Sequence, residues 1–367
     1  MPVEGLERVL DAAATNAQAV DRDARFPGET IGALAETGLL GLTIPEAVGG
    51  SGGGPAEFLE TTRAIASRCA SSAMIYMMHV CAAQVTLAGT PSGNSEALRG
   101  LASGERLGTL AFSERGSRSH FWAPVSQIAD GMISAQKSFV TSAGHAKIYA
   151  VSTRPEGMDE PLASSLYLVG DDAPGVEVGP AWGGLGLRGN ASAPMTFNTP
   201  VANAELLGEE GKGLDLMLGI VLPWFQLGSG AVSVGIAEGA VQAGVAHVTS
   251  AKLEHLGQTL VELPTVRARI GRSQTEVDAI GGFLSDLARR MGDAGASAPV
   301  LSAKAAANEM AIRVTSDIMQ ACGGAALSPA LPMQRSFRDA RAGSVMAPTT
   351  DVLYDLVGKA LAGMPLL

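Results

Sequence analysis

Helical spacing marks both ends of the chain, whereas its middle is made of short segments typical of strands. At the start, Val3, Leu6 and Leu10 recur at steps of three and four residues, the spacing of one buried helical face. From Leu107 to Phe197, short apolar runs alternate with clusters of Gly, Asp, Pro and Ser, which is typical of strands and turns. This order differs from a doubly wound nucleotide-binding protein, where strands and helices alternate throughout.

The order predicts several domains, since 367 residues exceed one typical core. We expect a helical domain over residues 1–104, a β-domain over 105–206 and a second helical domain over 207–367. Gly184, Gly186 and Gly189 satisfy the GxGxxG spacing of a dinucleotide site. Such a site needs a long helix after the glycines, but residues 190–194 contain Asn, Ser and Pro, so we predict a turn between strands.

Composition excludes several classes of protein. The chain has 26 basic and 36 acidic residues, a formal charge of −10, which argues against nucleic acid as a partner. Hydrophobic residues make up 46%, which favours extensive burial, including burial between subunits. Cys69, Cys81 and Cys322 lack the spacing of a disulfide framework or a zinc site, so no metal is expected. Without a signal-peptide pattern or a recognised apolar run of membrane length, we expect a cytoplasmic protein with no membrane span.

Several stretches, spread over nearly the whole chain, resemble the acyl-CoA dehydrogenase family. Residues 39–50 are similar to the family's first loop, and residues 110–119 resemble the segment that approaches the flavin ring and the substrate thioester. Residues 137–144 resemble the family's second flavin segment, and residues 182–192 its late β-domain segment. The resemblance implies an α+β fold with an N-terminal helical domain, a central β-barrel or β-sandwich and a C-terminal four-helix bundle. It also implies FAD as the cofactor.

The resemblance assigns the flavin ring to residues of the β-domain. Phe112, Ser113 and Ser119 are expected at the flavin and the thioester path. Phe139 takes the position of an aromatic residue that covers the ring system, and Thr141 that of a threonine that hydrogen-bonds near its reactive nitrogen. A flavin needs an apolar wall and a few polar groups that tune its ring nitrogens, and these residue types supply both.

The adenosine diphosphate part of the flavin is expected at the helical domain of a neighbouring subunit. Gln320, Gly323 and Gly324 match the family segment that lies against it, and glycine lets backbone approach a phosphate closely. The family's arginine after the first long C-terminal helix is missing, so Lys252 and His255 are the expected cations for the pyrophosphate. We also include Thr349 among the expected cofactor residues.

The position of the family's catalytic base holds no carboxylate. After a landmark that matches residues 337–341, the family continues to Tyr-Glu-Gly-Thr, whose glutamate removes the substrate's α-proton; the same count reaches Ala347 here. Some members place the glutamate on the first long C-terminal helix instead, but residues 221–227 contain neither Glu nor the usual Arg. A positioned base contributes roughly 10²- to 10⁴-fold in rate. Its absence from both positions is therefore the main departure from the family.

Asp351 and His120 are the candidate replacements for this base. Asp351 follows the expected loop closely enough to share its cleft, although an acidic residue in the first turn of a helix also stabilises the helix dipole. His120 lies in the segment beside the expected cleft, and histidine titrates near neutral pH. Asp355 is a weaker candidate, and Glu114 matches a family position that is not the base.

Three functions remain open from the sequence. The leading one is FAD-dependent α,β-desaturation of an acyl thioester, carried by coenzyme A or an acyl-carrier protein, with a relocated base. This enzyme is expected as a homodimer or homotetramer, with an electron-transfer flavoprotein as a candidate electron acceptor. The second is a flavin enzyme of different reaction, such as an oxygenase or desulfinase. The third is a non-catalytic subunit of a hetero-oligomeric acyl-CoA dehydrogenase whose partner provides the base.

Overall fold

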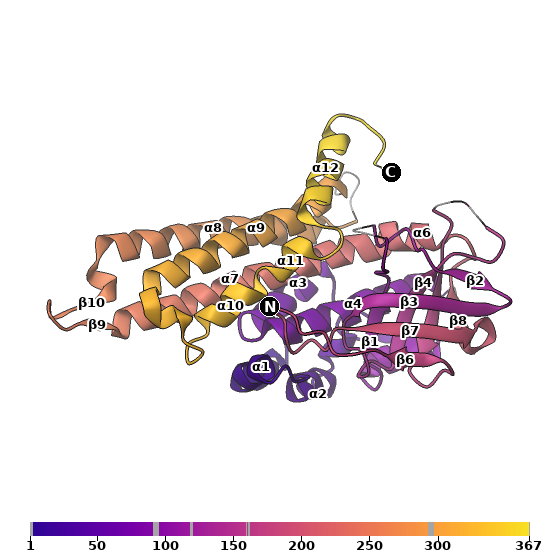
Figure 1. Cartoon of the computed structure of the whole chain (residues 1–367), viewed down its shortest axis with the longest axis horizontal. Coiled ribbons are helices and arrows are strands. Elements are labelled where there is room, and N and C mark those ends of the chain that lie inside the picture. Colours follow the sequence, from indigo (N-terminus) through magenta and orange to yellow (C-terminus); the bar gives the residue numbers. More distant parts are fainter. Residues whose placement is uncertain are drawn as a thin grey trace.

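The computed structural model describes residues 3–90, 95–117, 120–158, 160, 162–292 and 297–366. Within them, helices occupy both ends of the chain and two main β-sheets lie between, which confirms the predicted order (Figure 1). The molecule is elongated, with these two sheets at one end of its long axis and the tips of the long C-terminal helices at the other (Figure 1).

The N-terminal part is helical and packs around one apolar helix, α4. Almost every residue of α4 is buried, because the helix contacts α3, the long C-terminal helix α7 and the first strand β1. In α1, Leu6 and Leu10 are only half-buried, and the fully buried face runs from Val9 to Val20, slightly turned from the expected one. The helices are α1 (Leu6–Arg22), α2 (Gly28–Glu36), α3 (Pro55–Ala66), α4 (Ala70–Gly89) and α5 (Glu96–Ser103).

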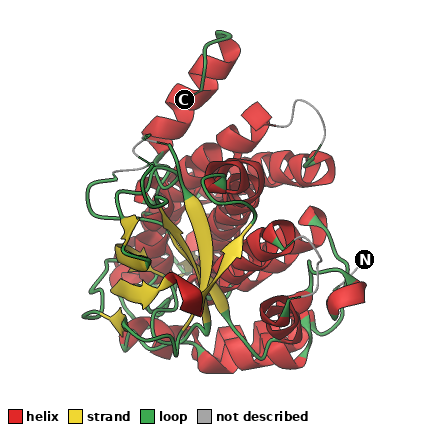
Figure 2. Ribbon diagram, turned by 90° about the vertical axis from the view of Figure 1, so that its right-hand side faces the viewer, coloured by secondary structure: helices red, strands yellow, loops and turns green. Residues whose placement is uncertain are grey.

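The central part is a β-sandwich of two four-stranded sheets that share a core (Figure 2). Tyr149 and Phe197 meet across this core with ring centroids 5.6 Å apart. One sheet has the order β1 (Gly108–Ala111), β4 (Ile148–Thr153), β5 (Ser165–Gly170) and β8 (Ala204–Leu207). The other has the order β2 (Gln127–Ala129), β3 (Met132–Val140), β7 (Ala193–Pro200) and β6 (Val176–Val178).

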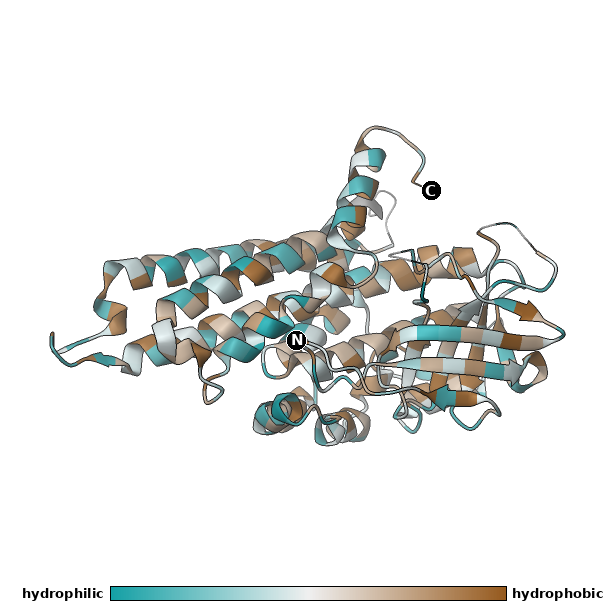
Figure 3. Ribbon diagram, in the orientation of Figure 1, coloured by the Kyte–Doolittle hydropathy of each residue, from teal (hydrophilic) through white to brown (hydrophobic). Residues whose placement is uncertain are grey.

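The two sheets differ in what covers their outer faces. Strand β4 is buried along its whole length, because its second face packs into the helical core through residues such as Ile148 and Ala150. Strand β3 alternates buried and exposed residues along most of its length, the pattern of a sheet with one solvated face, and it carries both hydrophilic and hydrophobic residues (Figure 3). The glycines of the GxGxxG spacing lie in the connection between β6 and β7, and no helix follows them. The predicted turn is therefore confirmed.

The C-terminal part is built from three long packed helices, α7, α8 and α9. The fourth member of the expected bundle is divided into short helices: α10 packs against α7 and α9, and α12 packs against α9 while its C-terminal end projects from the body (Figure 1). A π-helix over Met217–Val221 precedes α7 and accommodates Pro223, whose ring disturbs regular helical bonding. The elements are α6 (Gly213–Leu216), α7 (Leu222–Ser250), the hairpin β9 (Lys252–Leu253) and β10 (Gln258–Thr259), α8 (Pro264–Arg290), α9 (Ser297–Cys322), α10 (Met333–Asp339), α11 (Ala342–Val345) and α12 (Thr350–Leu361).

Two helical segments are long and apolar enough to span a membrane by length and composition, a point that the sequence analysis missed. They are Ala70–Gly89 and Gly213–Ser250, and 89% and 78% of their most apolar windows are buried inside the protein. Core helices of a soluble protein pass the same test, and the burial fits that explanation.

Two family landmarks that lie far apart in the sequence bond to each other. The Leu187 N–H, in the late β-domain segment, donates to Asp339 Oδ1 over 2.7 Å. Arg338 donates to the Leu185 carbonyl over 2.9 Å and pairs with Asp21 of α1 at 2.5 Å. These contacts hold the β-sandwich, α1 and α10 together, so this part of the resemblance serves the fold.

Candidate functional site

A bulge in strand β3 presents Phe139 to the outside of the sandwich. The register between β3 and β7 shifts between Lys137 and Val140, and Phe139 adopts a positive φ of 55°. Its ring is 57% exposed and makes an edge contact with Trp182, which is 54% exposed, at a centroid distance of 4.8 Å. Large exposed aromatic rings in contact form an apolar platform of the kind that covers a cofactor ring.

The polar residues of the two flavin segments lie beside this platform. The Ser138 N–H donates to the Ser113 carbonyl over 2.8 Å, which joins the segment after β1 to the bulge. Thr141 and Ser142 follow the bulge and are buried, and Ser142 Oγ has no hydrogen-bond partner among the described residues. The structure thus brings Ser113, Phe139 and Thr141 together, as the resemblance implies, whereas Ser119 lies outside the described residues.

A buried ion pair fixes the two segments against each other. Lys137 Nζ lies 2.7 Å from Glu114 Oε1, and both side chains are buried. Lys137 also donates to the carbonyl and hydroxyl of Ser152, at 2.5 and 3.1 Å, while Ser126 and Val125 donate to Glu114. Burial alone raises the pKa of Glu114, but the Lys137 charge and these hydrogen bonds outweigh it and lower that pKa. Glu114 is therefore held as a structural carboxylate, with its oxygens occupied.

Buried aromatic rings lead from the flavin strand into the helical domain. Phe112, directly after β1, stacks with Phe121 at a centroid distance of 6.0 Å. Phe121 contacts Trp122 at 5.2 Å and Phe225 of α7 at 6.4 Å. All four side chains are buried. Phe225 lies in the segment 221–227, where the resemblance implies the second position of the base, and a buried aromatic ring occupies this segment.

A buried lysine of α9 binds the backbone of the loop around Ala347. Lys304 Nζ donates to the Met346 carbonyl over 2.7 Å and to the Pro348 carbonyl over 2.5 Å, so both residues that flank Ala347 contact the same amine. The same Nζ lies 5.7 Å from the centre of the Phe225 ring. The Lys304 side chain is fully buried, with 0% exposure, and burial lowers its pKa to about 7.

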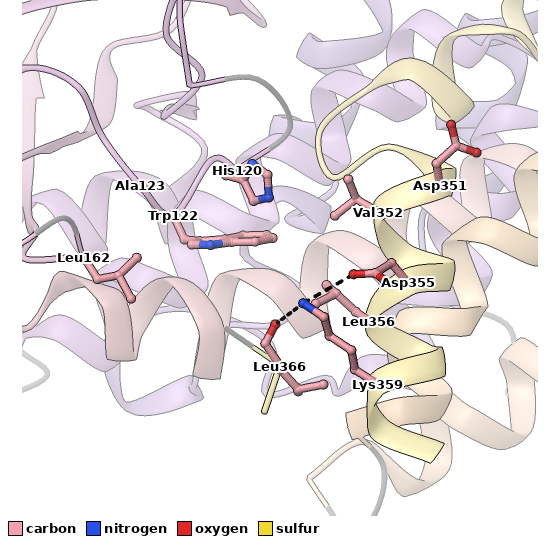
Figure 4. A pocket seen from close by; sticks show the side chains of 10 residues that line it. All are labelled: His120, Trp122, Ala123, Leu162, Asp351, Val352, Asp355, Leu356, Lys359 and Leu366. Carbon is pink, nitrogen blue, oxygen red and sulfur yellow. Dashed lines mark hydrogen bonds and ion pairs between the residues drawn. The ribbon is translucent and has the colours of Figure 1, made fainter. Parts of the chain in front are cut away.

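The two candidate replacements for the base line one open cavity of about 650 Å³ (Figure 4). The cavity lies between the segment after β1 and helix α12, and Lys359 on its wall pairs with Asp355 at 3.4 Å. His120 makes an edge contact with Trp122 at 5.3 Å. Asp351 stands exposed in the first turn of α12, and its carboxylate points away from His120 and Trp122 (Figure 4).

The residues expected at the adenosine diphosphate lie far from Phe139 within one chain. Lys252 and His255 are exposed at the hairpin that follows α7, at the opposite end of the long axis from β3 (Figure 1). Gln320 lies in the last turn of α9, and Gly323 and Gly324 follow the end of that helix directly. They lie near the same tip, since Cys322 packs against Gly244 of α7. Gly323 has a positive φ of 66°, a conformation that glycine adopts without strain. Thr349 caps the start of α12 and lies apart from this group.

Sequence reasoning missed Lys304 and its polar neighbours. The available signal was a lysine inside the alanine-rich stretch over residues 303–307. A lysine on an apolar helix face is uncommon, because its charged group is rarely buried without a partner. Gln226, one residue after Phe225, is also fully buried, and neither of its amide atoms has a hydrogen-bond partner among the described residues. A buried amide without partners is uncommon in folded proteins and marks a place where a ligand or water completes the bonds.

Comparison with known proteins identifies the family. The N-terminal, middle and C-terminal domains of acyl-CoA dehydrogenase match residues 4–105, 109–199 and 211–362. The chain belongs to the acyl-CoA dehydrogenase family. It is 30% identical over 346 residues to acryloyl-CoA reductase (NADH) from Anaerotignum propionicum, which covers 92% of this chain and 87% of that protein.

Solved structures share the whole fold. Butyryl-CoA dehydrogenase from Megasphaera elsdenii superposes with a TM-score of 0.89 over 99% of both chains, at 22% identity. The prolyl acyl carrier protein oxidase AnaB superposes with a TM-score of 0.86 over 98% of both chains, at 18% identity. At these identities the likeness shows the fold alone. The family match and the relative at 30% identity show that the chain is an FAD-dependent oxidoreductase of the acyl-CoA dehydrogenase type. Members of this family bind acyl-CoA and typically form oligomers.

The residues present fit the ring half of FAD. The Phe139 and Trp182 rings offer an apolar wall. Thr141 and Ser142 come two and three residues after Phe139 and are buried, and Ser142 Oγ has no hydrogen-bond partner among the described residues. Burying a phenylalanine side chain stabilises a contact by about 1.5–3 kcal/mol. We therefore expect Phe139→Ala to weaken FAD binding by roughly 10- to 100-fold, since each 1.4 kcal/mol is tenfold.

Titration of the apoprotein with FAD, followed by quenching of flavin fluorescence, measures this effect. Leu206→Ala is the matched control, because Leu206 is also an exposed apolar residue but lies on β8 of the other sheet. Equal losses of affinity in both variants would show that Phe139 does not cover the flavin.

Proposed function

We propose that this chain catalyses the α,β-desaturation of an acyl thioester with FAD, using a proton-transferring group other than residue 347. The observation that carries this proposal is the bond between Ser138 and Ser113, which joins both flavin segments at one place. The buried aromatic residues that begin with Phe112 extend to the cavity lined by His120 and Asp351 through Trp122, and to the Ala347 loop through Phe225 and Lys304. Substrate carbons would have to lie between the flavin segments and this cavity or loop to lose a hydride on one side and a proton on the other.

The chain's own residues bind and orient in this reaction. Phe139 and Trp182 would hold the flavin ring, and Thr141 with Ser142 would supply hydroxyl groups near its nitrogens. When bound, FAD supplies the acceptor for the hydride of the β-carbon. Phe112 and its aromatic neighbours exclude water from the path between the flavin strand and the Ala347 loop, because their side chains are packed without exposure.

We infer that the working unit contains at least two copies of the chain. The ring platform at Phe139, on β3, and the glycine segment at Gly323, which follows α9, lie toward opposite ends of one chain, so one chain does not bring them together (Figure 1). A second copy, placed with its α9 tip beside the first copy's β3, would complete the site. A homodimer or homotetramer is therefore proposed, and light scattering during size-exclusion chromatography measures the number of copies.

Anaerobic titration of the FAD-loaded protein with acyl-CoA thioesters tests the proposed function. The expected result is loss of the visible absorption of oxidised FAD when the acyl group has hydrogens on its α- and β-carbons. The control is an acyl-CoA whose α-carbon carries two methyl substituents and therefore no hydrogen. It is expected to leave the flavin oxidised.

The other two functions give different results in the same experiment. A yellow protein that is inert to thioesters but oxidises NAD(P)H or a reduced flavin partner would favour an oxygenase or desulfinase. A protein that gains FAD only after mixing with a homologous subunit would favour the role of a non-catalytic subunit. Acyl groups on coenzyme A and on an acyl-carrier protein are compared in parallel to identify the carrier.

Asp351→Asn tests the carboxylate candidate at the cavity. The Asp351 carboxylate is exposed in the first turn of α12 and points away from His120 and Trp122. We therefore expect it to stabilise α12 by about 0.3–1 kcal/mol through the helix dipole, and its replacement to leave flavin reduction nearly unchanged. Stopped-flow absorption measures the rate of flavin reduction by acyl-CoA. A fall of roughly 10²-fold or more, the range of a positioned base, would instead identify Asp351 as that base.

A further inference from the structure

Both positions where the family carries its base converge on one buried amine. Lys304 Nζ contacts the carbonyls on either side of Ala347, at 2.7 and 2.5 Å. It also lies 5.7 Å from the centre of the Phe225 ring, in the helical segment that is the alternative base position. Two positions that serve the same substrate proton in different proteins must face the same point in space, and here Lys304 Nζ bonds to the backbone beside one of them and lies close to the aromatic ring at the other.

The bonds of Lys304 suit both of its protonation states. A neutral amine has two N–H donors, and the two carbonyls accept both. The remaining position on nitrogen then holds either the lone pair or a third N–H. No salt bridge to Lys304 is found among the described residues, and burial accounts for its lowered pKa without any charged neighbour. The acidic groups of α12 and α9 are directed elsewhere: Asp351 is exposed, Asp355 pairs with Lys359, and Glu309 accepts from Tyr354.

Buried polar atoms without hydrogen-bond partners among the described residues lie on one face of α7. Gln226 and Ser233 are seven residues apart and so share one face, and Ser233 bonds to Asn308, one turn after Lys304 on α9. Both amide atoms of Gln226 and the hydroxyl of Ser229 are buried without partners among the described residues. Buried donors and acceptors without partners on α7, the helix that packs against α9, are suited to a polar group of a substrate, such as a thioester carbonyl.

We propose that Lys304 is the catalytic residue that moves the α-proton of the acyl thioester in place of the missing glutamate. This inference rests on the proposed function. The neutral amine takes the α-proton, so the C–H bond breaks and an N–H bond forms. The electron pair left on the α-carbon would form the new double bond as the β-carbon loses its hydride to the acceptor that bound FAD would supply, and the ammonium later returns its proton to water. In the reverse direction the ammonium protonates the α-carbon of an enoyl thioester.

Two substitutions separate proton transfer from support of the loop. Lys304→Arg keeps a cation that can donate to both carbonyls but cannot release a proton at neutral pH. Lys304→Met removes the donors and keeps the length of the side chain. Exchange of the α-hydrogens of butyryl-CoA with D₂O, followed by proton NMR, measures proton transfer alone, without flavin turnover. FAD dissociation constants and thermal midpoints show whether each variant is folded.

We expect both variants to lose α-exchange by roughly 10²- to 10⁴-fold while FAD binding is kept. Wild-type exchange by Lys304→Arg would overturn the proposal, because the lysine would then only hold the loop. If Lys304→Met fails to fold, Lys304→Arg decides alone: a folded Lys304→Arg that binds FAD and has lost exchange supports the proposal. A wild-type protein that shows neither exchange nor flavin reduction would instead contradict the proposed function.

Discussion

Replacing Lys137 by methionine is expected to lower the free energy of unfolding by about 3–5 kcal/mol, the cost of leaving a buried charge without its partner. The carboxylate of Glu114 would keep its bonds from Val125 and Ser126 but lose the cation 2.7 Å away. Because this pair joins the segment of Ser113 to the bulge of Phe139, FAD binding is expected to weaken as well.

Urea unfolding followed by circular dichroism measures this loss. Lys147→Met is the matched control: Lys147 pairs with Asp171 at 2.6 Å, but its side chain is 55% exposed, so we expect a loss below about 1 kcal/mol. Losses of equal size would show that the buried pair contributes no more than a surface pair.

The pair of Lys137 and Glu114 also makes the stability of the fold depend on pH. The folded-state pKa of Glu114 lies below its ordinary value of 4.5, so its stabilising contribution is present above that pH. It is lost as the pH falls through the folded-state pKa. In Lys137→Met the uncompensated burial of Glu114 should instead favour the protonated carboxyl, so acidification toward pH 4.5 is expected to recover part of the lost stability.

Replacing Phe225 by alanine is expected to have the largest effect on substrate range. Phe225 packs between Phe121 and Lys304, at the point where the acyl chain would pass from the flavin strand toward the Ala347 loop. Removing the ring costs about 3–5 kcal/mol in stability. It also opens space for additional methylene groups, each of which changes discrimination in an apolar pocket by roughly 10-fold or more. We therefore expect the preference for longer over shorter acyl-CoA thioesters to rise at least about tenfold.

Phe58→Ala is the control for this prediction. Phe58 is fully buried in the same core but contacts Tyr76 and Trp224 instead of Phe121 and Lys304. It should cost similar stability without changing chain-length preference, which is measured as the ratio of flavin reduction rates with octanoyl-CoA and butyryl-CoA. If both variants shift this ratio equally, Phe225 does not line the acyl path.

Periodicity explains why the order of elements could be predicted. Apolar residues at helical steps in α1 and α9, and short runs between turn residues in the middle, depend on local sequence alone. Phe139 and Thr141 are two residues apart at the end of β3, so the sequence alone places them close to each other. The bulge that turns Phe139 outward could not be predicted, since it depends on the register of β3 against β7.

The other half of the site depends on contacts across the fold. Lys304 becomes buried only because α9 places it under a loop more than forty residues later, and the sequence gives no sign of that contact. His120 and Asp351 share a cavity although they come from the β-sandwich and from α12. The division of the expected fourth bundle helix likewise follows from packing in the last part of the chain.

Isotope effects on flavin reduction test most directly whether this site removes an α-proton although residue 347 is alanine. The measurement compares butyryl-CoA with its α-deuterated and β-deuterated forms in anaerobic stopped-flow experiments with the FAD-loaded wild-type protein. We predict slower flavin reduction with deuterium at either carbon. Flavin reduction at one unchanged rate with all three forms, or no reduction by any of them, would contradict desaturation at this site.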